Sequence, residues 1–178
     1  GLRLPGIRLC RDGQLLPDIS DIIAANSRLP TMAMGDLNAE LAAVNIAAAR
    51  MDELCERYGA AGVAEAFAHI LTTAEQEAST AVLALPDGTY VAEDWVDGDG
   101  QSDARIPVQV KVTIEGTRMI VDFTGSAEAR PGPINCTRGA LQSAVKSVFK
   151  ALVGPHAPSS EGWFRPVEIV VPDGTIFS

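Results

Sequence analysis

The sequence has few of the residues on which most metal and redox sites depend. Its 178 residues include only 3 cysteines and 2 histidines. Cys10, Cys55 and Cys136 are far apart, so they form neither a CxxC pair nor a cysteine–histidine zinc framework. We therefore predict that this chain holds no metal and that it works in a reducing compartment, the cytoplasm.

Basic residues are also scarce. The chain has 14 Lys and Arg against 23 Asp and Glu, which gives a net charge of −9. Nucleic-acid backbones and anionic lipid surfaces both attract clustered Lys and Arg, so this balance excludes proteins that bind through such patches. The sequence also has no run of about 18 apolar residues, the length that spans a bilayer. We predict no nucleic-acid partner and no membrane association.

The bulk composition is that of a folded globular segment, with 47% hydrophobic and 21% charged residues. The chain begins at Gly1 rather than Met and stops at Ser178, just after the turn sequence Pro172-Asp173-Gly174. That turn should lead into a strand or a further segment. We expect the chain to be a piece of a longer polypeptide.

The pattern along the chain predicts one α+β segment over residues 1–178. Residues 1–35 form an extended lead-in and a short helix that Pro30 ends. Residues 36–85 form a long antiparallel helical hairpin. Residues 86–178 form a small antiparallel sheet with an additional helix, packed beside the hairpin.

Helical periodicity is strongest in the hairpin. Apolar residues recur at spacings of four and three from Leu37 to Tyr58, between Asp36 as N-cap and Gly59 as the C-terminal stop. A second helix then runs to Leu85, and the short link makes the two helices antiparallel neighbours. The seam between them also suits packing against other subunits.

The period changes to two after Pro86. Residues 89–95, 106–114 and 119–123 are expected to form a three-stranded meander. A helix follows over residues 141–153, and residues 167–171 form one more strand. The helix is expected to face inward with six apolar residues: Leu141, Ala144, Val145, Val148, Phe149 and Leu152.

The most informative stretch is Phe123–Ser126, continued after a spacer by Pro131–Thr137. Asn135, Thr137 and the following backbone amides lie just before a helix, where they can receive an anion or a carbonyl oxygen. Simple helix capping explains the same two residues equally well. Arg130 and Arg138 flank the stretch and can bind a carboxylate, although surface solvation is the ordinary role of either alone.

Two further readings are weaker. The acidic loop Asp97–Asp103 begins like a calcium-binding loop, but Ser102 takes the place of the sharp-turn glycine and Val108 that of the bidentate glutamate, which favours a solvated loop. Cys136 precedes a helix, where a thiol can become nucleophilic, but a small packed cysteine is the better default.

The order of these features resembles the B subunit of the hydantoinase/oxoprolinase family over essentially the whole chain. The residues that carry the resemblance are Gly1–Pro5, Ala24–Arg28, Gly35–Ala39, Glu56–Gly59, Leu85–Tyr90, Val121–Ser126, Gly132–Asn135, Phe164–Glu168 and Pro172–Thr175. The resemblance implies an ATP-dependent hydrolase that opens hydantoin- or 5-oxoproline-type rings together with a hydantoinase A-type subunit or domain. Related enzymes instead carboxylate ketones, and a mainly structural segment without catalytic residues is the other alternative.

In such enzymes a ring carbonyl oxygen is phosphorylated and water then attacks, so donors must stabilise a tetrahedral oxyanion. The resemblance makes Asn135 and Thr137 the candidate catalytic residues, and Gly132 and Arg138 the candidate substrate-binding residues. ATP and a divalent metal are expected in the complete enzyme and no cofactor in this fragment. The fragment alone is expected to be inactive, with the remainder of the B subunit as a further partner and an oligomer as the assembly.

Overall fold

The structure is a computed structural model that describes residue 2 and residues 4–178. The predicted motif Gly1–Pro5 therefore lies partly outside the described residues. The chain folds as two compact units, Gly1–Ala64 and Glu65–Ser178. Among the described residues, no helix is both long and apolar enough to cross a membrane.

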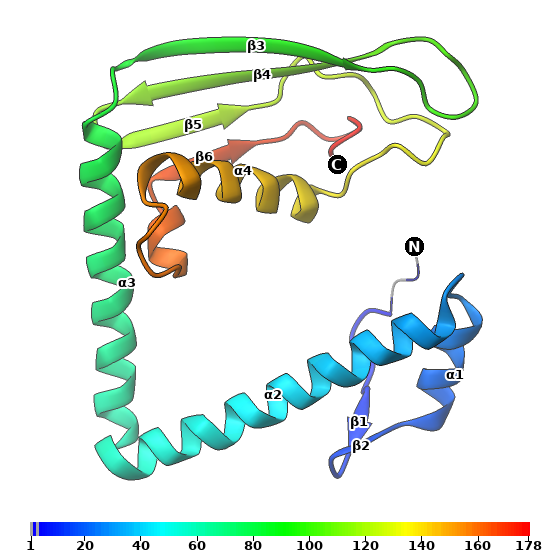
Figure 1. Ribbon diagram of the computed structural model, residues 1–178, viewed down its shortest axis with the longest axis vertical. Coiled ribbons are helices and arrows are strands. Elements are labelled where there is room, and N and C mark those ends of the chain that lie inside the picture. The colour runs from blue at the N-terminus through cyan, green and yellow to red at the C-terminus, as the bar shows by residue number, and fades with distance from the viewer. Residues whose placement is uncertain (1, 3) are drawn as a thin grey trace. The chain divides into compact units, whose positions relative to one another are not determined.

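The first unit contains a small β-ribbon and two helices (Figure 1). Strands β1 (Cys10–Arg11) and β2 (Gln14–Leu15) pair antiparallel around Asp12 and Gly13, which both adopt positive φ. Helix α1 (Pro17–Ala25) contacts α2 (Pro30–Tyr58). Both helices begin with proline, whose fixed φ suits the first helical turn and whose missing N–H costs nothing there.

Helix α2 therefore begins earlier than predicted. Pro30 starts it instead of ending a preceding element, so Asp36 lies within the helix and is not its cap. The predicted stop is confirmed, because Gly59 adopts a φ of 76° and its N–H donates to the Cys55 carbonyl. Helix α3 (Ala60–Leu83) follows at once. Antiparallel packing of α2 on α3 stays a prediction, because the two helices fall largely in different units.

The second unit is built on a four-stranded sheet in the order β3-β4-β5-β6. Strands β3 (Gly88–Val96), β4 (Ile106–Glu115) and β5 (Arg118–Asp122) form the predicted antiparallel meander. Strand β6 (Val167–Val170) pairs parallel to β5, so the sheet is mixed and not wholly antiparallel. A parallel pair needs a crossover connection, and helix α4 (Arg138–Val153) supplies it. The predicted α+β class is confirmed.

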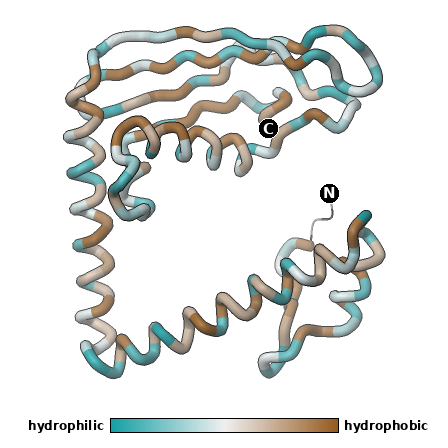
Figure 2. The backbone as a smooth tube through the Cα atoms, in the orientation of Figure 1, coloured by the Kyte–Doolittle hydropathy of each residue, from teal (hydrophilic) through white to brown (hydrophobic). Residues whose placement is uncertain are grey.

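The main core lies between α4 and one face of this sheet (Figure 1). Its buried members are Val82, Ile114, Met119, Val121, Phe123, Leu141, Phe149 and Val171. A smaller cluster joins Ala74 and Ala78 of α3 to Trp163 of a 3-10 turn, η1 (Glu161–Phe164). Figure 2 shows the apolar stretches along the strands and α4, whereas the loop from β3 to β4 is largely hydrophilic.

One prediction about α4 is wrong. Leu141 and Phe149 are buried and Val145 is half-buried, but Ala144 is exposed, and Val148 and Leu152 are 69% and 59% exposed. The sheet covers only part of the apolar face of α4, and the three exposed side chains line an open groove beside it.

Candidate functional site

Three loops of the second unit meet at one end of the sheet. They are residues 97–103 between β3 and β4, residues 124–137 between β5 and α4, and residues 172–177 after β6. Backbone hydrogen bonds join the last two loops: Ala129 N–H donates to Gly174 O at 2.8 Å, and Cys136 N–H to Ile176 O at 2.7 Å. We call these three segments the loop cluster. It contains every site residue that the sequence predicts except Arg138, which follows it directly as the first residue of α4 (Arg138–Val153).

The turn at Phe123–Ser126 is fastened to strand β4. Gly125 has a φ of 100°, and this backbone angle requires glycine; a Cβ there would lie 1.9 Å from Gln109 Oε1, the end of a side chain that can shift. Ser126 is buried, and its hydroxyl donates to Gln109 O and accepts from Gln109 N–H. These bonds fix the direction in which the chain leaves the sheet.

The carboxylate of Asp122 also stabilises this turn. Its carboxylate accepts the backbone N–H of Thr124 at 2.9 Å and lies 3.0 Å from Lys111 Nζ. Hydrogen bonds from Thr124, followed by the Lys111 ammonium, lower the pKa of Asp122. The carboxylate is therefore a charged, structural part of the turn at neutral pH.

The acidic loop is mostly exposed, as predicted, except at Asp99. This residue is buried, and its Oδ1 accepts N–H groups from Gln101 and Ser102 at 2.9 and 2.8 Å. Those two amides, with the charge of Arg130 as a smaller contribution, lower the pKa of Asp99. The loop closes on its own backbone, which agrees with the preference for a loop over a calcium site.

Gly132 is the point where the acidic loop touches the second loop. A Cβ on Gly132 would lie 1.9 Å from the carbonyl oxygen of Asp99 and 2.8 Å from its carbon. Backbone cannot retreat from such a contact as a flexible side chain can. Gly132 is therefore required for the packing of the two loops, and its predicted role in substrate binding stays a prediction.

Asn135 closes the second loop with both ends of its amide. Its Oδ1 accepts Arg130 N–H at 2.9 Å, and its Nδ2 donates to Arg130 O at 2.6 Å and to Gly132 O at 3.4 Å. The side chain thus acts as a clamp across five residues. In this arrangement the amide is bonded within the protein, and the predicted oxyanion role stays a prediction.

Thr137 and Arg138 fix the start of α4. Thr137 is the N-cap, and its hydroxyl accepts Ala140 N–H at 3.3 Å. Arg138 donates to Val171 O at 3.1 Å and to Asp173 Oδ1 at 2.8 Å, which ties the helix to the third loop. The capping alternative for Thr137 is present in the structure, and a substrate carboxylate would have to compete with Asp173 for Arg138.

Cys136 packs against the main core, and its thiol lies 3.5 Å from the carbonyl of Thr137. This agrees with the packed-cysteine reading. Over residue 2 and residues 4–178, no group of three or more His, Cys, Asp or Glu side chains is placed to hold a metal ion. The donor set of these described residues therefore does not fit a divalent metal, so the metal expected in the complete enzyme stays a prediction and we derive no step through it.

Three residues in or beside the loop cluster were not predicted: Asp99 as the buried loop anchor, Gln109 of β4 as the partner of Ser126, and Asp173 as the partner of Arg138. Gln109 and Asp173 have no local signal, because each acts on a residue far away in sequence. The only hint of Asp99 was its position between two glycines.

Comparison with known proteins matches the whole chain to one family. The family model described as hydantoinase B/oxoprolinase matches residues 1–178. A Pseudomonas sp. strain NS671 protein, assigned as the B subunit of a D-/L-hydantoinase, is 33% identical over 99% of this chain and 32% of its own length. The acetophenone carboxylase delta subunit of Aromatoleum aromaticum is 28% identical over 100% of this chain and 26% of its own.

A solved structure agrees with the family match. The crystal structure of ATP-dependent caprolactamase from Pseudomonas jessenii superposes with a TM-score of 0.85 and 26% identity, over 99% of this chain and 31% of that one. The chain thus spans about a third of the length of the relatives it matches. With a family match over every residue and a shared fold, the chain belongs to the hydantoinase B/oxoprolinase family.

Proposed function

We propose that these 178 residues are a segment of a B-type subunit of an ATP-dependent enzyme that opens cyclic amide rings together with an A-type partner. The whole-length family match carries this proposal, and the similarity to a solved ATP-dependent caprolactamase supports it. ATP and the divalent metal belong to parts of the assembly outside this chain. The substrate class is a five- to seven-membered cyclic amide, taken from the names of the relatives.

The loop cluster is the functional part of this segment in our proposal. Opening an amide ring places charge on a carbonyl oxygen, and preorganised N–H groups stabilise such charge. The amides at the first turn of α4 are donors of this kind, because the first N–H groups of a helix have no partner within the helix. The Thr137 hydroxyl accepts one of these N–H groups, that of Ala140. The other N–H groups at the start of the turn lie beside the loop cluster.

Asn135, Thr137 and Gly132 then act as positioning residues. Asn135 holds the loop that precedes α4, and Gly132 allows the acidic loop to close over it. Arg138 is charged and 47% exposed, so a substrate carboxylate can reach it and compete with Asp173 for its guanidinium. A displacement of about 1 Å in the groups that these residues position can lower turnover by about a hundredfold.

The test is substrate-dependent ATP hydrolysis by the intact B protein mixed with its A-type partner. We would compare hydantoin, N-methylhydantoin, 5-oxoproline and caprolactam with ketones plus bicarbonate. ATP hydrolysis that rises only with a cyclic amide, with release of the opened product, is the expected result. Turnover of a ketone alone, dependent on bicarbonate, would refute the hydrolase assignment.

The carboxylase alternative is favoured by one observation, the 28% identity to an acetophenone carboxylase delta subunit over the full chain. A mainly structural role is the second alternative. Asn135→Ala separates it from the proposal: a lower kcat with subunit assembly and KM for ATP unchanged supports positioning at the site. Loss of assembly, or no effect on turnover, supports a structural segment.

A further inference from the structure

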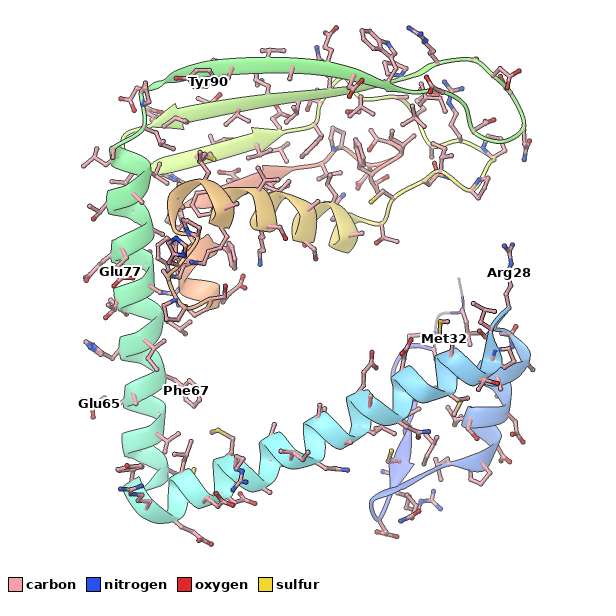
Figure 3. All side chains as sticks on the ribbon, in the orientation of Figure 1. Arg28, Met32, Glu65, Phe67, Glu77 and Tyr90 are labelled. Carbon is pink, nitrogen blue, oxygen red and sulfur yellow. The ribbon has the colours of Figure 1, made fainter. Side chains whose placement is uncertain are left out.

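An open apolar groove of about 580 Å³ lies between α4 and the inner face of strands β3 and β4. Its walls are made by alternate residues of the strands, such as Val110 and Val112, and by Val145, Val148 and Leu152 of α4. Val148 and Leu152 are mostly exposed, and Tyr90, on β3 (Figure 3), is 47% exposed. The second unit therefore exposes an apolar surface that continues directly from its main core.

The size of the sheet explains why the groove exists. Neighbouring strands lie about 4.8 Å apart, so the four strands span about 14 Å between the outer strand axes. A helix with its side chains is about 10 Å wide and covers only part of that face. Helix α4 covers the side of β5 and β6 and part of β4, and the side of β3, where Tyr90 is 47% exposed, remains open.

The groove does not suit a cyclic amide. The only hydroxyl among its lining side chains, that of Tyr90, donates to the Pro86 carbonyl at 3.0 Å, and the other lining side chains are hydrocarbon or thioether. The N–H and C=O groups of a lactam or hydantoin would find no partner there, which makes their burial costly. An uncharged, hydrocarbon-lined surface resembles the interior of a domain more than the polar rim of a transient interface.

We propose that this groove holds a second amphipathic helix, supplied by the part of the same polypeptide that lies outside these 178 residues. The inference rests on the proposed function, because it takes the chain as a segment of a longer B-type protein. The matched relatives are about three times as long as the match, so about two thirds of their length is free to supply the helix. A helix beside α4 at the usual distance of about 8–10 Å would touch α4 and the open strands at once.

The geometry of the groove also sets the length of this helix and the pattern of its apolar residues. To run along the 16 residues of α4, it needs about four turns, or roughly 24 Å. It carries apolar residues at spacings of three and four on one face, which fill the groove between Val148 and Tyr90. The residues that line the groove carry no charge, so we expect the face of the second helix that enters the groove to carry none.

The test uses the intact polypeptide with a photoreactive benzoylphenylalanine at position 148 and, as control, at position 143 of α4. Both side chains are exposed in this chain, but Ser143 lies on the far side of the helix from the groove. After irradiation, the cross-linked peptides are identified by mass spectrometry in a mixture of isotopically heavy and light protein. Maleimide labelling of Val148→Cys and Ser143→Cys, read at each peptide, gives a second measurement.

We expect position 148 to cross-link to a helical peptide outside residues 1–178 of the same molecule, and position 143 not to do so. We also expect Val148→Cys to label at least about tenfold more slowly than Ser143→Cys, because it is covered. A heavy–light cross-link, a cross-link to the A-type partner, or equal labelling without a cross-link would overturn the proposal. None of these readouts depends on catalysis, so an enzyme inactive on cyclic amides would refute the proposed function alone.

Discussion

The apolar core and the loop cluster of the second unit lie on the same sheet but are stabilised by different interactions. The core joins α4 to the strands through side chains such as Phe149 and Val121, which are 2% and 6% exposed. The loop cluster has few buried apolar groups and is held by backbone N–H groups that donate to the side chains of Asn135, Ser126 and Asp99. Core packing tolerates exchange of hydrocarbon for hydrocarbon, whereas the cluster depends on individual donors and acceptors.

The largest effect is expected in the core. Phe149→Ala should lower the free energy of unfolding by about 3–5 kcal/mol, because it removes a buried ring and leaves a cavity between α4 and Phe164. Chemical denaturation checks this. Gln142→Ala, an exposed change on the same helix, should stay within about 0.5 kcal/mol of the parent. Equal midpoints for the two variants would show that α4 does not pack as described.

Loss of the loop clamp comes next. Asn135→Ala removes three hydrogen bonds to the backbone of residues 130–132 and should cost about 1–3 kcal/mol. Asn135→Asp keeps the acceptor for Arg130 N–H but places a carboxylate oxygen against the carbonyl oxygens of Arg130 and Gly132, so it should be clearly less stable than the parent. Denaturation midpoints rank the three proteins. An alanine or aspartate variant as stable as the parent would contradict the clamp.

The close approach of Gly132 gives an effect of similar or slightly smaller size. Gly132→Ala places a methyl group against the Asp99 carbonyl and should destabilise by about 1–3 kcal/mol through forced movement of the two loops. Gly139→Ala is the matched control. It meets no atom within 4 Å and lies in α4, where alanine is favoured over glycine by about 0.5–1 kcal/mol. The two variants should therefore shift the melting temperature in opposite directions.

The helix cap contributes less. Thr137→Ala leaves the N–H of Ala140 without its side-chain acceptor and should cost about 1 kcal/mol. Thr137→Ser keeps the hydroxyl and should recover most of that loss. Helix content by circular dichroism and the unfolding midpoint together measure this loss of stability. A serine variant as unstable as the alanine variant would mean that the methyl group, and not the cap, stabilises this site.

The smallest effect is a dependence on pH. The pKa of Asp99 is lowered from its ordinary value of 3.8 in the folded protein, so its stabilisation is fully present above that value. It is lost as the pH falls through the lower, folded-state pKa. Asp99→Asn should therefore be less stable than the parent at pH 6, and the difference should shrink towards pH 3. A difference that stays constant with pH would contradict a charged Asp99.

Much of the core was predictable from the sequence, because it follows from periodicity. Alternation identified β4, spacings of three and four identified α4, and Gly59 identified the end of α2. The parallel pairing of β6 was missed, since a short apolar run does not specify its neighbour. Pro30 was misread because proline is compatible with both the end of one element and the start of the next.

The loop cluster was predictable only as a location. The composition of the stretch from Gly132 to Arg138 indicated a constrained loop before a helix, and that loop is present. Its partners were not predictable, because Asp99 and Asp173 lie more than thirty residues away along the chain from the residues they meet. Local sequence contains no information on such pairings. This is also why a hydrogen-bonded clamp and a catalytic donor could not be distinguished for Asn135.

The most direct test of the central claim is turnover of the intact enzyme with Gly132→Ala beside Gly139→Ala. The assay is ATP hydrolysis coupled to opening of a cyclic amide, measured well below both melting temperatures, with subunit assembly checked in parallel. If the loop cluster positions the reacting groups, Gly132→Ala should lower kcat by at least about tenfold while Gly139→Ala stays near the parent. Equal turnover of both variants, with both fully assembled, would show that the loop cluster only stabilises the fold.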